Sequence, residues 1–153
     1  MKLSSKGRYG VRAVFDIAFH NDGKATQIKD IAERQVIPAR FLEQIFQDLK
    51  RAGIVTSKRG PRGGYQLARE PRDLTVGDVI RAIEGPIDLG APELGETSEA
   101  SDPTSLDVTQ QAFRDLGAKL DAALDSLSIG ELVERGEALG IRRRQASKYA
   151  YVI

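Results

Sequence analysis

Residues 59–64, Arg-Gly-Pro-Arg-Gly-Gly, form the segment that most restricts the fold of this chain. Short apolar and β-branched runs flank it at 54–58 and 65–68, so the pattern predicts two strands joined by a tight loop. An isolated two-stranded hairpin is marginally stable in water and has to pack on another element. The segments that precede it have helical apolar spacing, which predicts a hairpin resting on a helical bundle.

Three helices are predicted before the hairpin. The first has Ser4 or Ser5 as its N-cap, and the second is short and is capped by Thr26. The third begins at Pro38, which suits a first helical turn, and stops before Gly53. The apolar face of the first helix consists of Tyr9, Ala13, Val14, Ile17 and Ala18.

The third helix separates apolar from polar side chains. Its buried stripe consists of Leu42, Ile45, Phe46 and Leu49, and its outer face of Arg40, Glu43, Gln44, Gln47 and Arg51. Two helices, a turn and a third helix with a polar face make a helix-turn-helix, whose last helix enters the major groove of DNA. The hairpin is then a wing, and its tip carries Lys58, Arg59 and Arg62 on a glycine-rich backbone that can approach a sugar–phosphate wall closely.

Charge is distributed unevenly along the chain, although the formal net charge is only +1. Residues 1–72 contain 15 Lys and Arg against 7 Asp and Glu, whereas residues 73–141 contain 4 against 15. A basic first half favours nucleic-acid binding, because phosphate neutralisation dominates the affinity of proteins for DNA. From the charge alone, the alternative to nucleic-acid binding is a solvated surface whose charge is unevenly distributed.

The second half is predicted to contain further helices and an acidic loop. A short helix covers 73–84, and a capping box at Ser128 and Glu131 starts a final helix that stops at Gly140. The segment between them at 85–106 has the Gly, Pro, Ser, Thr and acid content of a loop. The expected organisation is a winged helix-turn-helix domain at 1–84, a flexible acidic effector loop at 85–106, a dimerisation helix and C-terminal helix at 107–140, and a basic tail at 141–153.

A helix at 103–127 carries an apolar stripe with heptad spacing. The stripe consists of Phe113, Leu116, Leu120, Ala123 and Leu127. Because the N-terminal module already has a core, we expect the same helix of a second copy to cover the stripe in a twofold dimer. The alternative is that the helix folds back on its own domain.

Residue types that the chain lacks exclude several classes of function. With no cysteine and one histidine, disulfides, thiol catalysis and thiolate metal sites are excluded, and we expect no enzyme activity and no metal site. His20 is expected to be a charge partner for the C-terminus of the first helix. The chain has no apolar run of about eighteen residues and no signal-peptide pattern, so we expect a cytoplasmic protein without a membrane span.

The order of these motifs resembles the IscR/CymR/NsrR family (Rrf-type) of bacterial winged-helix transcription regulators, and the chain is identified as a cysteine-free member. The resemblance covers nearly the whole chain, apart from 88–106 and the last dozen residues. Its most specific part is the wing RGxxGGY after the helix LEQIFxxLxxAG. The matching segments are MKLSSKGRYGVRA, IAERQVIPARFLEQIFQDLKRAGIV, SKRGPRGGYQLAR, LTVGDVIRAIEG and SIGELVE.

The resemblance implies a mainly α fold with a small β-hairpin, and a homodimer bound to a palindromic operator. The positions at which the family contacts DNA correspond to Lys6, Tyr9, Arg40, Phe41, Gln44, Ser57, Arg59, Gly60 and Pro61. The residue chemistry adds Glu43 and Arg62. Gln44 can pair with an adenine edge, Arg40 with guanine or a phosphate, and Phe41 with a thymine methyl group. Arg59 suits a narrow minor groove.

Glu43 has two interpretations. It can accept a hydrogen bond from cytosine N4 and act as a selectivity element, or it can pair with Lys50 or a neighbouring arginine.

The chain departs from the family in the segment where many members carry three cysteines that bind an iron–sulfur cluster. The corresponding positions are near Gly95, Ser101 and Asp107, and a fourth ligand would fall near Gln110. We therefore expect no cluster. The acids of the loop show no calcium-binding spacing, and they are Asp88, Glu93, Glu96, Glu99 and Asp102. The absence of cysteine from the whole chain favours a natural loss.

The function predicted is sequence-specific DNA binding by a homodimeric transcription regulator, expected to be a repressor and to respond to a protein or small-molecule effector. The alternative is a regulator that acts mainly through protein–protein interaction, with the acidic loop and the helix seam binding a metabolic enzyme or another partner.

Overall fold

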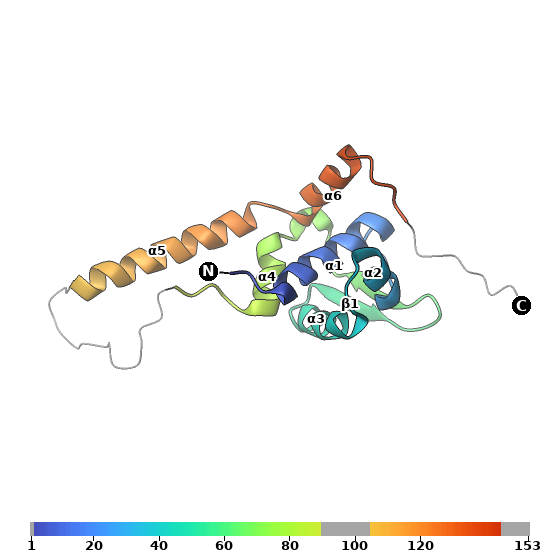
Figure 1. The fold of residues 1–153 in the computed structure, drawn as a ribbon, viewed down its shortest axis with the longest axis horizontal. Coiled ribbons are helices and arrows are strands. Elements are labelled where there is room, and N and C mark those ends of the chain that lie inside the picture. The colour runs from blue at the N-terminus through green and yellow to red at the C-terminus, as the bar shows by residue number, and fades with distance from the viewer. Residues whose placement is uncertain (1, 90–104, 145–153) are drawn as a thin grey trace, which may run out of the picture.

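Three short helices and a hairpin follow one another in the order that the sequence predicts (Figure 1). The structure is a computed structural model and describes residues 2–89 and 105–144. The elements of these ranges are α1 (Ser5–Asn21), α2 (Ile28–Gln35), α3 (Ala39–Arg51), β1 (Val55–Lys58), β2 (Gly64–Leu67), the 3₁₀ helix η1 (Pro71–Asp73), α4 (Val76–Glu84), α5 (Ser105–Asp125) and α6 (Ile129–Ala138). The fold class is therefore mainly α with one small hairpin, as predicted.

Helix α1 is the centre of the core, because α2, α3, α4 and α6 all pack against it. The predicted apolar faces of α1 and α3 meet there. The fully buried side chains include Val14, Ile17 and Phe19 of α1 and Leu42, Ile45, Phe46 and Leu49 of α3. Burial of an aliphatic or aromatic side chain contributes about 1.5–3 kcal/mol, so this contact fixes the rotation of α3 about its axis.

The two strands pair antiparallel, with Val55 opposite Leu67 and Lys58 opposite Gly64. The hairpin also pairs with the chain between α1 and α2, because the backbone N–H groups of Thr26 and Tyr65 each donate to the other residue's carbonyl at 2.9 Å. A side chain at Gly64, where φ is +140°, would clash with the Thr26 carbonyl. Glycine is therefore required where the hairpin crosses the α1–α2 connection.

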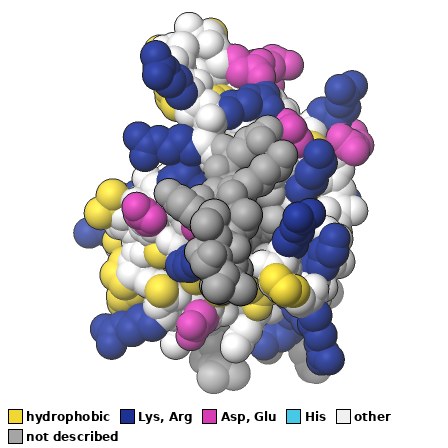
Figure 2. Space-filling model, turned by 90° about the vertical axis from the view of Figure 1, so that its right-hand side faces the viewer, with side chains coloured by type: hydrophobic (Ala, Val, Ile, Leu, Met, Phe, Trp, Pro, Cys, Tyr) yellow, Lys and Arg dark blue, Asp and Glu magenta, His cyan; other side chains and the backbone are white. Residues whose placement is uncertain are grey.

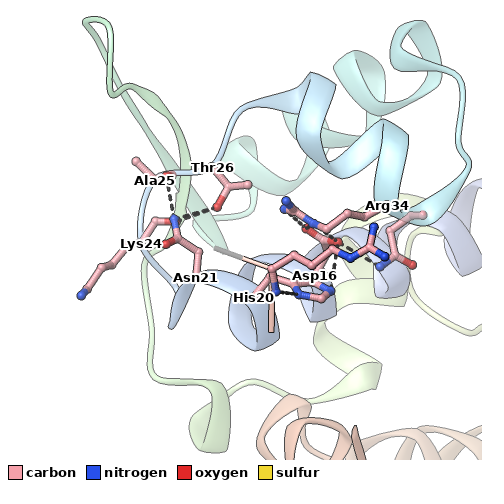
Figure 3. Close-up of polar contacts among 9 residues, drawn as sticks. Asp16, His20, Asn21, Lys24, Ala25, Thr26 and Arg34 are labelled. Atoms are coloured by element: carbon pink, nitrogen blue, oxygen red, sulfur yellow. Dashed lines mark hydrogen bonds and ion pairs between the residues drawn. The ribbon is translucent and has the colours of Figure 1, made fainter. Parts of the chain in front are cut away.

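The predicted helix caps are confirmed with one exception. Ser4 caps α1, and Ser128 and Glu131 form the capping box of α6. Thr26 does not cap α2, since Gln27 holds that position without a side-chain hydrogen bond. Thr26 is instead fully buried (Figure 3), donates to the Lys24 carbonyl and accepts from the Asn21 amide. Its extended pairing with the hairpin takes precedence over the local capping preference.

Helix α5 projects away from the other helices (Figure 1). Ion pairs join its C-terminal half to α4, from Arg81 to Asp121 at 2.9 Å and to Asp125 at 2.6 Å. The hydrogen bond from Arg81 lowers the pKa of Asp125. The expected start of this helix at 103 lies outside the described residues, as do most of the 85–106 loop and residues 145–153 of the tail.

A buried polar cluster joins α1, α2 and the chain after α6 (Figure 3). Asp16 is fully buried and accepts two hydrogen bonds from Arg34 Nε and one from its Nη2, the last at 2.6 Å, and another from Gln35. His20 Nδ1 accepts from the backbone N–H of Arg144 at 2.9 Å. Burial lowers the pKa of His20, and this exceeds the opposing effect of Asp16. The expectation of a charged His20 at the helix terminus is thus wrong, because its buried ring serves as a neutral acceptor.

Within 2–89 and 105–144, no helix combines the length and the apolar character that crossing a bilayer requires.

The pKa of His20 predicts how stability depends on pH. Because its folded pKa lies below the ordinary value of about 6.5, the unfolded chain takes up a proton first, and stability falls as the pH drops through that value. His20→Gln keeps an acceptor for Arg144 and does not titrate. Thermal unfolding of the variant between about pH 7.5 and 5.5 should therefore show a smaller loss of melting temperature than the wild type. Identical pH profiles would contradict the assignment.

Candidate nucleic-acid interface

The outer face of α3 is a continuous exposed polar stripe. Its members are Arg40, Glu43, Gln44, Gln47 and Arg51, and all five are exposed. Their spacing of three and four residues places them on one side of the helix, opposite the buried Leu42 and Phe46. The polar outer face of α3 is therefore exposed as predicted, and the side chains proposed to contact bases are directed away from the core.

The flank of α3 that faces α1 is held by an ion pair. Lys6 Nζ lies 2.7 Å from Asp48, and Arg51 lies 3.2 Å from the same carboxylate. The candidate contact residue Lys6 thus lies beside α3, and Tyr9 follows it in the first turns of α1. Tyr9 is half-buried, and the Arg12 guanidinium covers its ring at 5.4 Å. Asp48 was not predicted here, because its pairing with Lys6 spans 42 residues.

The opposite flank of α3 is joined to the hairpin. Lys50 Nζ donates to Ser57 Oγ at 2.9 Å, and the rings of Phe46 and Tyr65 stack with their centroids 4.5 Å apart. The hairpin therefore has a fixed position relative to the outer stripe. Sequence analysis named Lys50 only as an ion-pair partner of Glu43, although its position just before the α3–β1 turn could have suggested contact with the strand.

The hairpin tip carries cations on a tightly turned backbone. The amide of Gln27 donates to the Pro61 carbonyl at 3.3 Å, and Gly60 adopts φ +106°. Arg59 and Arg62 are exposed and have no ion pair with any described residue. Figure 2, viewed from the side on which the tip protrudes in Figure 1, shows a face on which Lys and Arg side chains outnumber the acidic ones. Such a face attracts a polyanion.

Glu43 makes no ion pair within the described part of the chain. The expected partner Lys50 donates to Ser57, and of the neighbouring arginines Arg51 pairs with Asp48. Arg40 lies over the Phe41 ring at 5.2 Å. The ion-pair interpretation of Glu43 is therefore wrong for this structure, and its carboxylate is available to a base edge.

The predicted dimer stripe on α5 is largely exposed and, over most of its length, is not covered by residues 2–89 or 105–144. Phe113 and Leu116 are 50% and 49% exposed, Ala123 is exposed, and Leu120 and Leu127 are half-buried. A run of large apolar side chains in solvent indicates a surface that another molecule covers. The alternative, that α5 folds back on its own domain, holds only for its C-terminal half, which the ion pairs of Arg81 join to α4.

The residues present do not fit a thiolate-bound metal cluster. The chain has no cysteine, and among residues 2–89 and 105–144 no group of three or more His, Asp or Glu side chains could hold a metal ion. Of the positions that correspond to cluster ligands, Gly95 and Ser101 lie outside the described residues, and Asp107 and Gln110 lie on the first turns of α5.

The free polar stripe of α3, the cationic hairpin beside it and the start of α1 define a winged helix-turn-helix protein that binds DNA. Residues 3–135 match the model of the Rrf2 family, described as iron-dependent transcriptional regulators. The chain belongs to the Rrf2 family and is a DNA-binding transcription regulator.

Several relatives share this architecture. The chain is 40% identical over 145 residues to the HTH-type transcriptional regulator IscR of Vibrio atlanticus, covering 95% of this chain and 82% of that protein. Among solved structures it is similar to T. potens IscR, with a TM-score of 0.71, 36% identity and coverage of 99% and 96%. It is also similar to CymR, the global cysteine regulator of B. subtilis, with a TM-score of 0.69, 34% identity and coverage of 88% and 98%. These relatives are named as regulators and not as enzymes.

Removal of the negative charge of Asp48, at the edge of α3, should raise the affinity for DNA. Asp48→Asn removes a negative charge beside the stripe and releases Lys6 and Arg51 from their ion pairs. Binding to any duplex should strengthen several-fold, and the slope of log affinity against log salt should steepen by about 0.9 for each new phosphate contact. Asp73→Asn in η1 makes the same charge change away from α3 and is the control. Equal gains in both variants, measured by salt titration, would refute a specific role for Asp48.

Proposed function

We propose that this regulator binds a palindromic operator as a homodimer and represses transcription. The observation that carries the proposal is the exposed α3 stripe, bounded by Lys6 on one side and the hairpin cations on the other. An α-helix fits the major groove of B-DNA, and a cationic hairpin beside that helix can contact the adjacent backbone and minor groove. Blocking of a promoter by such a dimer is the simplest route from this geometry to regulation.

The proposed base contacts follow from side-chain chemistry. Gln44 reads an adenine edge, Arg40 binds guanine or a phosphate, and Phe41 packs on a thymine methyl group. Glu43 accepts from cytosine N4 and disfavours other bases.

The remaining proposed contacts hold the sugar–phosphate backbone and the minor groove. Arg59 and Arg62 enter a narrow minor groove, where the negative potential is enhanced. The contacts that position the protein on the backbone are assigned to Lys6, Tyr9, Ser57, Gly60 and Pro61.

The homodimer is proposed from the α5 stripe. Twofold symmetry lets one stripe cover the other, and it gives two recognition helices that read the two halves of a palindrome. The seam residues are Phe113, Leu116, Leu120, Ala123 and Leu127.

We also propose that the protein works without a cysteine-ligated iron–sulfur cluster. The family is described as iron-dependent, but a cluster of the usual kind is held by thiolates and this chain has none. A different effector, a protein or a small molecule, would then control DNA binding. The alternative of a mainly protein-binding regulator rests on the acidic loop, most of which lies outside the described residues, and on the α5 seam, which we assign to the homodimer.

Gln44 and Arg59 should contribute to DNA binding in different ways. On an operator selected from random duplexes, Gln44→Ala should cost about 1–3 kcal/mol and should cost much less on scrambled DNA. Arg59→Ala should weaken binding and reduce the salt slope by about one unit. The measurement is a salt titration with chelator-treated protein, since no iron should be required. Unchanged operator affinity in both variants would remove the basis of the assignment.

The α5 seam predicts the oligomeric state. Leu120→Glu or Leu116→Glu buries a charge in the seam, so sedimentation at micromolar concentration should show monomers where the wild type is a dimer. Ala122→Glu lies on another face of the same helix and should remain dimeric. A monodisperse wild-type monomer would contradict the proposed dimer, and circular dichroism would confirm that each variant is folded.

A further inference from the structure

A pocket of about 440 Å³ lies where α6 packs against the end of α1 and the 3₁₀ helix η1. Small-molecule sites in proteins occupy about 300–1,000 Å³, so this pocket is large enough for a metabolite. Its apolar lining consists of Ala18, Pro71 and Val133. Its charged lining consists of Asp22, Glu70, Arg72, Glu134 and Arg143.

Two of these charges neutralise each other within the chain. Arg143 forms ion pairs with Asp22 and with Glu137, which follows α6's contribution to the pocket by one turn. The Arg143 guanidinium also lies over the Phe19 ring, 5.4 Å from its centroid. Arg143 and Asp22 therefore form a wall of the pocket whose charges are already paired.

The other three charges form no ion pair with any residue of 2–89 or 105–144. They are Glu70, Arg72 and Glu134. Two carboxylates that line one pocket are stabilised by cationic groups placed beside them, and a guanidinium is stabilised by a carboxylate. The pocket thus offers a ligand two anionic groups and one cationic group.

The walls that carry these three side chains are joined by backbone contacts. The N–H of Ile129 donates to the Leu74 carbonyl at 2.8 Å, which ties the start of α6 to the chain after η1. A Cβ at Gly130 would lie 3.0 Å from Arg72 Cα, so the absence of a side chain there lets η1 approach α6 closely. Glu134 lies one turn after Gly130, on the same face of α6.

We propose that this pocket binds a basic amino acid, a small molecule with one carboxylate and two cationic groups, and that this ligand is the effector of DNA binding. Arg72 binds the carboxylate, and Glu70 and Glu134 bind the two cationic groups, so each of the three unpaired charges has one partner. The methylene groups of the ligand pack on Ala18 and Val133. The inference rests on the regulatory function proposed above and names the chemical class of its effector.

The pocket lies behind the base of the hairpin. Asp22 precedes Gly23, whose carbonyl accepts a hydrogen bond from the N–H of Leu67 in β2 at 2.9 Å. A ligand that joins Arg72 to Glu134 restrains the chain leaving β2 relative to α6. A restrained hairpin loses less conformational freedom when DNA binds, so we expect the bound ligand to strengthen operator binding.

Calorimetric titration of the full chain tests the match of charges. Lysine, ornithine and arginine are titrated first. The one that binds most tightly is compared with its decarboxylated amine and with an analogue whose side chain is neutral, which for lysine are cadaverine and norleucine. Each analogue should bind at least about tenfold more weakly, because each loses one charge-assisted contact.

Variants assign each contact to a residue. Arg72→Gln should weaken binding of the amino acid but should not weaken binding of its decarboxylated amine. Glu70→Gln and Glu134→Gln should weaken both ligands. Arg135→Gln and Glu33→Gln make the same charge changes at exposed positions outside the pocket and should bind as the wild type does. Circular dichroism shows that each variant is folded.

The remaining outcomes overturn separate parts of the inference. No binding of any of the three amino acids, or equal losses in the control variants, would overturn the site. Equal affinity for the amino acid and both analogues would overturn the charge match. A saturating amino acid should strengthen operator binding at least about fivefold, and an unchanged or weaker affinity would overturn the effector role. Failure to bind any duplex, with or without the amino acid, would instead refute the proposed function and leave the calorimetric result for the pocket standing.

Discussion

The packing of α3 on α1 determines which side chains this regulator can offer to DNA. The apolar side chains of α3 that face α1 are fully buried, so α3 cannot rotate without opening the core. They are Leu42, Ile45, Phe46 and Leu49. Replacing one of these side chains with alanine in a close-packed core typically costs about 2–5 kcal/mol. The polar residues of the opposite face are consequently held in one orientation, which is what base recognition requires.

The hairpin is positioned by contacts with both ends of the helix-turn-helix. Thr26 pairs with Tyr65 at the α1–α2 connection, and Lys50 holds Ser57 at the end of α3. These contacts make the cationic tip and the α3 stripe parts of one surface. Asp48 lies at the edge of that surface and reduces its positive charge, whereas Asp121 and Asp125 of α5 pair with Arg81 on α4. The uneven charge of the sequence thus separates a DNA-binding surface from the projecting helix.

Local patterns in the sequence were sufficient to predict the helices and strands, but they did not predict the contacts between residues far apart in the chain. The faces of α3 and the α6 capping box could be predicted because periodicity and capping are properties of neighbouring residues. Thr26 was assigned to a cap because nothing local reveals its pairing with Tyr65, 39 residues away. His20 was expected to be charged because nothing local reveals its contact with the backbone of Arg144, 124 residues away.

Groove-specific footprinting of the selected operator tests most directly whether α3 and the hairpin form one DNA-binding surface. Dimethyl sulfate methylates guanine N7 in the major groove and adenine N3 in the minor groove, so one reagent reports on both. The account predicts two symmetry-related sets of protections, each with guanines in the major groove and adenines in the adjacent minor groove. Protections confined to a single groove, or none on an operator that the protein binds, would contradict it.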